Sequence, residues 1–435
     1  MKKIFKAISM VAVSAVMACG FAACDGGGDS DVDSAGNTIV KIMFHVDERS
    51  TEGQAYKKRI DEFNTAYKDK KIKASASYKA RTTGAAGYET ELINKQVEGT
   101  LPDIITFDAP NCASYANSKL LYDISSLVPQ DVQDDFISLN KYNGKLYGLP
   151  IQESSAGFYY NKKIFDRAGI DVSSYTVENP WTFDQFKDVC SQLKSRGNVT
   201  AAVDMRFDAT RDETATYLLY PFIYASGGTF TSEDGFTATG YFNSSATQSG
   251  FQFLKDLITE GYSSYSIGAT DFFTGKVGMY LSSGWTIPDL DNKYKETFAS
   301  RDDWGLLPYP QGTAQASATG SWCYGITNNN HKDKSAAKEL LLWLTSTESS
   351  DAITTATGMI AARKSVNKNY TAGSPEDVLL QQLQLTGKAR PATVAYPTFS
   401  TCFNQIIYSL KDGNLTDLLT TQTNTLQTEM NRIKN

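Results

Sequence analysis

The chain has 435 residues and a formal net charge of −6, from 42 Lys and Arg against 48 Asp and Glu. This length exceeds one ordinary domain and suits two. The acidic balance makes nucleic acid and anionic membranes poor partners. Two histidines in all argue against a zinc site or a Ser-His-Asp triad, and no phosphate loop or dinucleotide fingerprint occurs. We therefore expect no metal and no cofactor.

The amino terminus has the pattern of an export signal. Three lysines precede a short apolar stretch of small residues, and the stretch closes on Phe21-Ala22-Ala23-Cys24. This closing sequence resembles a bacterial lipobox, which predicts a signal peptide over residues 1–23 and a lipid on Cys24. A weaker candidate ends at Cys19, and the alternative is a secreted protein in which Cys24 is incidental. Residues 25–37 contain four Asp and four Gly, so we expect residues 24–37 to form a disordered tether.

The next part of the chain alternates between two hydrophobic periods. Period-two or continuous apolar runs predict strands, and apolar residues three and four apart predict helices. The order is strand, helix, strand, helix, strand, at residues 39–46, 55–68, 71–78, 88–99 and 103–107. This order indicates an α/β fold with a parallel sheet covered by helices.

Beyond Pro150 the pattern changes to longer helices and loops. A capping box from Thr182 to Gln185 predicts the start of a helix that runs through Leu193. An Asp-Gly pair within residues 226–242 predicts a β-hairpin. Further helices are predicted at 245–261, 335–346 and 414–435.

Four cysteines follow Cys24: Cys112, Cys190, Cys323 and Cys402. An exported protein can form disulfides, and four cysteines allow three pairings that spacing cannot distinguish. Free buried thiols are the alternative that we favour.

The aromatic content suggests a site for sugars. The chain has 24 Tyr, 22 Phe and 5 Trp, and sugars stack their C–H faces on rings while their hydroxyls need polar partners. Trp285 and Trp322 stand among Gly and Ser in loop-like contexts. They are the candidates for stacking, with core packing as the alternative.

Eight segments together resemble a known family. In order along the chain they are IDEFNTAYKDKKIK, LPDIITFDAPNCASYANSKLLYDI, YNGKLYGLPIQESSAGFYYNKKIF, PWTFDQFKDVCSQL, FFTGKVGMYLSSGW, WGLLPYPQG, HKDKSAAKELLLWLTSTES and ATGMIAARKSV. They resemble the extracellular solute-binding proteins of bacterial carbohydrate ABC importers, the class that includes maltose-binding protein. The resemblance runs from about residue 38 to the carboxyl terminus.

The resemblance implies a periplasmic-binding-protein-like fold (class II) of two α/β lobes, with the ligand cleft between them. The chain would cross between lobes near residues 150, 320 and 365. Lobe one would then comprise residues 38–150 and 321–365. Lobe two would comprise residues 151–320 and 366–435.

The resemblance also nominates cleft residues. Trp285 matches a stacking tryptophan, and Asp108 and Asn111 follow a buried strand at the edge where α/β sheets bind ligands. Glu48 and Arg49 could reach the cleft from lobe one, while for them and for Asn111 a capping or surface role is the alternative. The remaining candidates are Glu153 at the first crossing, Tyr217, Tyr220, and Phe403, which stands where the family often carries Trp.

The function implied by the resemblance is non-catalytic. We expect a monomeric, lipid-anchored extracytoplasmic receptor that captures a mono- or oligosaccharide and delivers it to an ABC transporter permease. One rival is a secreted glycoside hydrolase or lyase, which would need two carboxylates at a working separation. The other is a receptor of the same fold for another solute, such as ferric ion, polyamine or glycerol phosphate.

Overall fold

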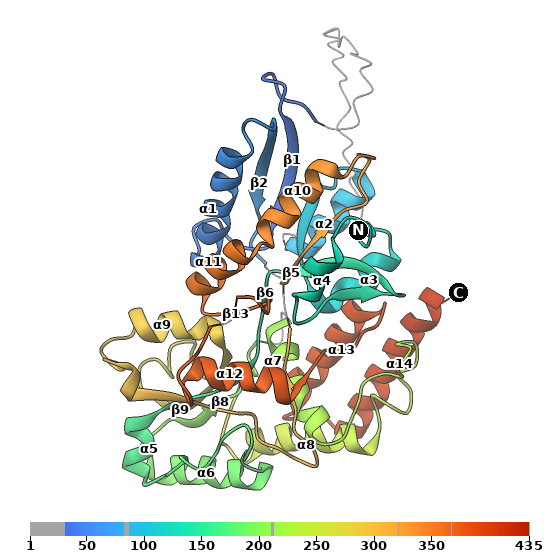
Figure 1. The fold of residues 1–435 in the computed structure, drawn as a ribbon. Helices are drawn as coiled ribbons and strands as arrows, with labels where there is room; N and C mark the ends of the chain where they lie inside the picture. The colour runs from blue at the N-terminus through green and yellow to red at the C-terminus, as the bar shows by residue number, and fades with distance from the viewer. Residues whose placement is uncertain (1–30, 82–86, 210–212, 321, 367, 435) are drawn as a thin grey trace, which may run out of the picture.

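The structure is a computed structural model that describes residues 31–81, 87–209, 213–320, 322–366 and 368–434. The predicted signal peptide and the lipid site at Cys24 lie outside the described residues. Two separate sheets, each covered by helices, form two lobes (Figure 1). The α/β, two-lobed prediction is confirmed.

Lobe one is built on a six-stranded sheet. The strand order is β2-β1-β3-β12-β5-β4, with β1 parallel to both β2 and β3, and β12 antiparallel to β3 and β5. The strands are β1 (Thr38–Phe44), β2 (Ile72–Tyr78), β3 (Ile104–Asp108), β4 (Asn140–Tyr142), β5 (Lys145–Pro150) and β12 (Trp322–Ile326). The helices of this lobe are α1 (Thr51–Ala66), α2 (Tyr88–Glu98), α3 (Cys112–Asn117), α4 (Gln130–Asp134), α10 (Ser335–Leu344) and α11 (Thr347–Thr357).

Local sequence explains where these helices begin and end. Ser50 caps α1 by accepting a hydrogen bond from the Gly53 amide, and the apolar stripe Tyr56, Ile60 and Phe63 is buried against the sheet. Gly99 ends α2 in the left-handed conformation, with φ of 69°, which a residue with a Cβ rarely adopts.

Lobe two is built on a four-stranded sheet in the order β10-β7-β9-β8. Its strands are β7 (Ala156–Asn161), β8 (Ala201–Asp204), β9 (Val277–Ser283) and β10 (Trp304–Leu307). Its helices are α5 (Lys162–Ala168), α6 (Phe183–Arg196), α7 (Glu213–Ala225), α8 (Ser245–Thr259), α9 (Ile287–Asn292), α12 (Pro375–Leu385), α13 (Tyr396–Ser409) and α14 (Leu415–Lys434). The predicted capping box is present at the start of α6, between Thr182 and Gln185.

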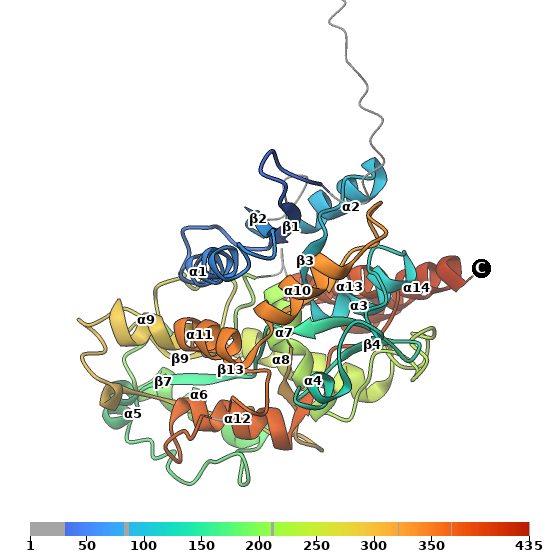
Figure 2. The same cartoon turned by 45° about the horizontal axis from the view of Figure 1, so that its top comes forward.

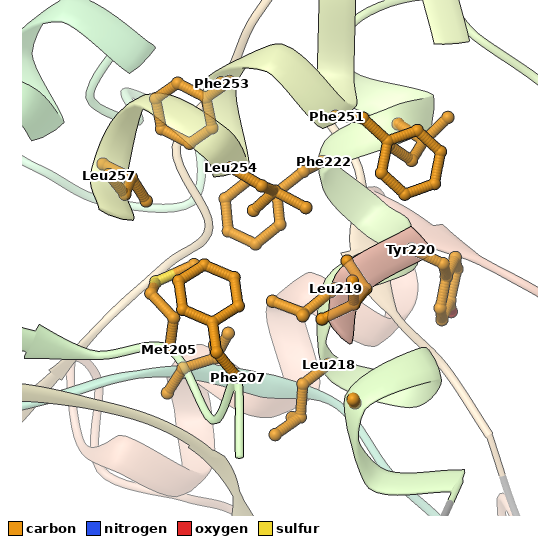
Figure 3. Close-up of a cluster of buried hydrophobic side chains, with 14 of the residues drawn as sticks. Met205, Phe207, Leu218, Leu219, Tyr220, Phe222, Phe251, Phe253, Leu254 and Leu257 are labelled. Carbon is orange, nitrogen blue, oxygen red and sulfur yellow. The ribbon is translucent and has the colours of Figure 1, made fainter. Parts of the chain in front are cut away.

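The core of lobe two is rich in aromatic rings. Phe222 of α7 stacks on Phe253 of α8 with ring centroids 5.6 Å apart. Figure 3 shows these helices sharing one apolar cluster with Met205 and Phe207. Burial of large apolar side chains of this kind supplies most of the driving force that holds the helices on the sheet.

Three connections join the two sheets. One runs from β5 to β7 through β6 (Gln152–Glu153), and a second runs from β10 to β12 through β11 (Ser317–Ala318). The third leaves α11 through β13 (Ile360–Ala361), which pairs antiparallel with β6. The predicted boundaries at residues 150, 320 and 365 fall at or within these connections and remain predictions.

Residues 31–37 correct the predicted tether. Val32 bridges Thr38, and the Ile39 amide donates to the Asp31 carbonyl at 2.7 Å. The Asp33 side chain accepts from the Ala35 and Asn37 amides, each at 2.9 Å. The prediction of disorder is therefore wrong for residues 31–37, because an aspartate that closes its own turn supplies hydrogen bonds that composition does not reveal.

The predicted hairpin at residues 226–242 is also wrong. The described residues there form turns and no strand, although the Asp-Gly pair does make a tight turn in which the Gly235 amide donates to Ser232. Phe230 and Phe242 are fully buried in the core of lobe two. The Asp-Gly pair therefore turns a loop that inserts its apolar residues into that core, and no strands flank it.

The four cysteines of the described chain, Cys112, Cys190, Cys323 and Cys402, are all buried and none of them forms a disulfide, as we favoured. Across the described ranges, none of the helices combines the length and the apolar character that a membrane span requires.

Candidate ligand-binding cleft

A cavity of about 490 Å³ opens between the two lobes. Its lobe-one wall includes Arg81, Asp108 and Trp322, and its lobe-two wall includes Tyr217 and Trp285. Asp108 at the carboxyl end of β3 and Glu213 at the amino end of α7 both line this cavity. The carboxyl ends of strands form the edge of a sheet at which α/β proteins bind ligands. Its volume lies within the ordinary range for small-molecule sites.

Arg390 holds the base of the cleft together. Its guanidinium binds Asp108 of lobe one through two hydrogen bonds, at 2.6 and 2.9 Å, and Glu213 of lobe two at 2.7 Å. All three side chains are at least 93% buried. Two carboxylates on one guanidinium form a charge-assisted, directional cluster. Burial by itself would lower the pKa of Arg390, but Asp108, Tyr396 and Glu213 raise it well above its usual value.

Glu213 has further partners on α13. The Tyr396 hydroxyl donates to one oxygen of Glu213, and the Ser400 hydroxyl donates to the other. The carboxylate is therefore saturated with donors, which is what a buried charge requires.

Trp322 is covered in part by neighbouring side chains. The His45 ring stacks on it with centroids 3.3 Å apart and planes 5° apart, and the Arg81 guanidinium lies 5.2 Å from the centroid. His45 also contacts the Thr106 hydroxyl at 3.0 Å. Burial, and secondarily Arg81, hold the pKa of His45 well below its usual value, so this ring is neutral and packs as an aromatic. Two side chains thus cover part of the Trp322 ring, although the residue still lines the cavity.

Trp285 is the open ring of the cleft. It follows β9 in a short 3₁₀ turn, Gly284–Thr286, and 41% of the residue is exposed. Tyr217 lies beside it with centroids 5.8 Å apart and planes tilted by 44°. A half-exposed ring in the lining of a cavity offers a stacking surface that core packing does not use.

Tyr217 also connects the lobes at the crossings. Its hydroxyl donates to the Ser154 hydroxyl at 2.8 Å, and Ser154 donates to the Gly320 carbonyl at 2.5 Å. Burial raises the pKa of Tyr217 to about 12, so the phenol stays protonated and acts as a donor. A side chain at position 320 would crowd Arg390, because a Cβ there would lie 2.8 Å from Nη2.

Four of the ten predicted ligand-binding residues line the cavity: Asp108, Tyr217, Trp285 and Trp322. The structure thus brings residues from β3, α7, β9 and β12 to one place. Ligand contact by these residues stays a prediction.

Six predicted residues are not among those lining the cavity. Glu48 and Arg49 are exposed beside it, where Arg49 pairs with Asp47 at 2.9 Å. Asn111 is buried at the end of a short 3₁₀ turn after β3. Glu153 is buried at the first crossing and accepts from the Ser138 hydroxyl.

Tyr220 and Phe403 are packed away from the cavity. The Tyr220 hydroxyl accepts from the Thr319 amide at 2.8 Å and donates to the Lys388 carbonyl. Phe403 is fully buried against Phe251 with ring centroids 5.2 Å apart. These two aromatic side chains hold the second crossing and the lobe-two core, so we leave them out of the proposed site.

Sequence reasoning missed Arg81, Glu213 and Arg390. Glu213 could have been found, because it precedes Tyr217 by four residues and so shares its helix face. Arg390 stands in the loop-like stretch GKARPAT, which carries no local pattern. Of the residues that the structure describes, no three His, Cys, Asp or Glu side chains are grouped to hold a metal ion.

Curated relatives match part of the chain. A protein of Brucella abortus (strain 2308), named only as a binding protein, is 27% identical over 223 residues, 48% of this chain and 49% of its own length. A Brucella suis protein matches to the same extent. The chain spans about half the length of the curated relatives it matches.

Solved structures match nearly the whole fold. The cyclic α-maltosyl-1,6-maltose binding protein of Arthrobacter globiformis has a TM-score of 0.74 at 23% identity, covering 91% of this chain and 100% of its own. The Listeria monocytogenes ABC substrate-binding protein Lmo0181, in complex with cycloalternan, has 0.73 at 19%, covering 91% and 99%. UgpB of Mycobacterium tuberculosis, in complex with glycerophosphocholine, has 0.73 at 20%, covering 91% and 99%.

The family model for bacterial extracellular solute-binding proteins matches residues 58–381, which include the four-stranded sheet and every strand of the six-stranded sheet except β1. Together with the two lobes and the cavity between them, this match identifies the chain as a member of the bacterial extracellular solute-binding protein family.

Proposed function

We propose that this protein captures a mono- or oligosaccharide in the cleft and delivers it to an ABC transporter permease. The observation that carries the proposal is the half-exposed ring of Trp285 in the lining of a cavity that also contains charged side chains. A sugar would stack a C–H face on this ring and place its hydroxyls toward the charged base of the cleft. The similar structures named with maltose-type and cycloalternan ligands support this choice.

The ionic cluster at the base suits a neutral ligand. Arg390 binds Asp108 and Glu213, and Arg81 places a second positive charge 3.9 Å from Asp108. The two buried carboxylates therefore face two cations, so a charged ligand would find no unmatched partner there.

Closure of the two lobes would complete the site. Trp285 belongs to lobe two and Trp322 to lobe one, so a ligand that touches both would favour the closed arrangement. Small-angle scattering with and without saturating sugar tests this. The radius of gyration should fall on binding, and an unchanged value with binding demonstrated by calorimetry would contradict closure.

The same proposal includes the lipid anchor at Cys24, extracytoplasmic location, monomeric state and absence of catalysis. Cys24→Ser should release the protein into the medium or leave an unprocessed precursor. A variant that remained membrane-bound and lipid-labelled would rule out the anchor. A glycoside hydrolase is disfavoured because Arg390 engages the carboxylates of both Asp108 and Glu213. The other carboxylates of the lining also have partners, Asp47 with Arg49, Glu52 with Tyr56 and Asp289 with Lys293.

A thermal-shift screen with saccharides tests the ligand class, followed by calorimetry on the hits. A ligand that binds only the folded state raises its stability, by about 2.7 kcal/mol at a hundredfold excess over Kd. The panel should contain glycerophosphocholine, because one structure of this fold is named with it. A response to that compound and to no saccharide would replace the sugar by another solute. New reducing ends after incubation with oligosaccharides would indicate an enzyme.

A further inference from the structure

Four segments meet at the end of lobe one that lies opposite the cleft. They are residues 31–37, the turn 67–73, the last half of α2 and the loop 328–334, which together we call the distal face. The amino ends of β1 and β3 lie here, whereas the carboxyl end of β3 reaches the cleft. Figures 1 and 2 draw the start of the described chain beside α2 at this end, away from lobe two.

Hydrogen bonds make the distal face one connected surface. The Asp103 carboxylate accepts from the Lys41 amide at 2.8 Å, from Asn329 at 2.8 Å and from the His331 ring at 2.7 Å. The Asn330 side chain donates to the Gly99 carbonyl at the end of α2. A surface tied by several segments presents its side chains in fixed positions.

This surface exposes large apolar side chains. Val97 is 83% exposed, Val32 59% and Ile93 54%. Ile93 and Val97 are four residues apart on α2, so they share one side of that helix. Exposed apolar groups gathered at one end of a protein mark an interaction surface.

The neighbouring turn is basic although the whole chain is acidic. Residues 67–73 carry four exposed lysines against the single acid Asp69. Two other acids at this end have partners: Asp31 pairs with Lys41, and Glu339 accepts from Tyr67 and pairs with Lys70 of the turn at 3.4 Å. A lysine close to an anionic lipid surface is attracted to it by about 1 kcal/mol.

The folding of residues 31–37 limits the reach of the proposed anchor. Only residues 25–30 separate Cys24 from Asp31. A fully extended chain advances at most about 3.5 Å per residue, so Asp31 stays within roughly 25 Å of a lipid on Cys24. The distal face, where Asp31 is fixed, is thus the part of the protein held closest to the membrane.

From the apolar side chains, the lysine-rich turn and the short reach, we propose that the distal face rests on the outer surface of the membrane, against anionic phospholipid headgroups. This inference rests on the lipid anchor of the proposed function. It orients lobe one toward the bilayer and leaves the cleft at the other end of the lobe, open to solute.

The test uses the lipidated protein in vesicles of phosphatidylglycerol and phosphatidylethanolamine with a headgroup-attached quencher. Val97→Cys carries a fluorophore, and Leu385→Cys on α12, where the native residue is 61% exposed, is the matched control on lobe two. The four described native thiols are buried and should not label. Quenching should be several-fold stronger at position 97 than at 385, and weaker when phosphatidylcholine replaces phosphatidylglycerol.

Equal quenching at the two positions would overturn the orientation. If position 97 were shielded only when the transporter is present, the distal face would belong to a protein partner and the proposal would be wrong. A dimer detected by analytical ultracentrifugation would assign the face to a second copy of this chain. If mass spectrometry found no diacylglyceryl group on Cys24, the inference would be overturned, because it rests on that lipid anchor. Sugar binding, measured by calorimetry on the same sample, reports separately on the ligand proposal.

Discussion

The two walls of the cleft each carry a tryptophan in a Gly- and Ser-rich stretch, yet the two rings differ in state. Trp322 on lobe one lies between His45 and Arg81. Trp285 on lobe two has one aromatic neighbour, Tyr217, and 41% of it is exposed. The difference arises because Trp322 begins β12 near the segments that follow β1 and β2, which carry His45 and Arg81, while Trp285 follows the end of β9.

The comparison shows that other side chains pack against the tryptophan of lobe one, which we call the built wall. The tryptophan of lobe two is partly exposed, and we call that side the open wall. On lobe one, Asp108 lies directly across from Trp322 in the β3–β12 pairing and is held by Arg390. On lobe two, the ring of Trp285 has no equivalent clamp. We therefore expect changes in the first wall to alter folding and changes in the second to alter binding.

The largest effect is expected at Arg390, which serves both walls. Arg390→Met leaves Asp108 and Glu213 buried without their cation and should cost about 3–5 kcal/mol of unfolding free energy. Urea unfolding of Arg301→Met gives the control, because Arg301 is half exposed while also pairing with two acids, Asp291 and Glu376. That change should cost about 1 kcal/mol or less. Equal losses of unfolding free energy in the two variants would show that burial of the ion pairs does not determine their contribution to stability.

The next effect is a pH dependence at Glu153, in the strand that links the walls. Burial raises the pKa of Glu153 to about 7 from its ordinary value of 4.5, in spite of the hydrogen bond from Ser138. The folded protein binds this proton more tightly than the unfolded chain. Its contribution to stability is therefore full below about pH 4.5 and is lost as the pH rises through about 7.

Glu153→Gln removes the charge and should abolish that loss. Relative to the parent, the variant should gain about 3 kcal/mol of unfolding free energy between pH 4 and pH 9. Urea titrations at both pH values measure it, with the exposed Glu233→Gln as control. A constant difference between parent and variant across this range would contradict the buried-proton account.

Trp322→Ala tests the built wall. Removal of the ring takes away the stack on His45 and should lower the unfolding free energy by roughly 2–3 kcal/mol, somewhat less than for a fully buried tryptophan. Thermal melting without ligand is the measurement. A variant that melts like the parent but binds sugar poorly would show that Trp322, like Trp285, contacts the ligand and does not support the fold.

Trp285→Ala tests the open wall. It should leave the melting temperature nearly unchanged and weaken sugar binding by about 2 kcal/mol, or thirtyfold, as expected for loss of an aromatic anchor. Calorimetric titration of the sugar found in the screen measures this. Tyr408→Ala, which removes a 65% exposed ring on α13, should change neither quantity. A large drop in melting temperature with normal affinity would assign Trp285 to the core.

Local rules account for what could be predicted. The strand–helix alternation, the Thr182 capping box and the Gly99 helix end depend on residues within a few positions of one another. The turn at residues 31–37 was missed because a single side chain, Asp33, closes it. The loop at 226–242 was misassigned because its apolar residues pack into a core formed by α13 and other helices that are distant in the sequence.

The sequence by itself determined the α/β class through its hydrophobic periodicity, and the family and its two lobes through the resemblance of its motifs, since both depend on residues that are neighbours in the chain. Only the tertiary structure decided which polar groups meet in the cleft: Arg390 and Asp108 lie 282 residues apart, and no local pattern links them. The tertiary structure also decided that Trp285 is the more exposed of the two cleft tryptophans. The exposure of a side chain depends on what other segments pack against it, and those segments are chosen by the fold as a whole.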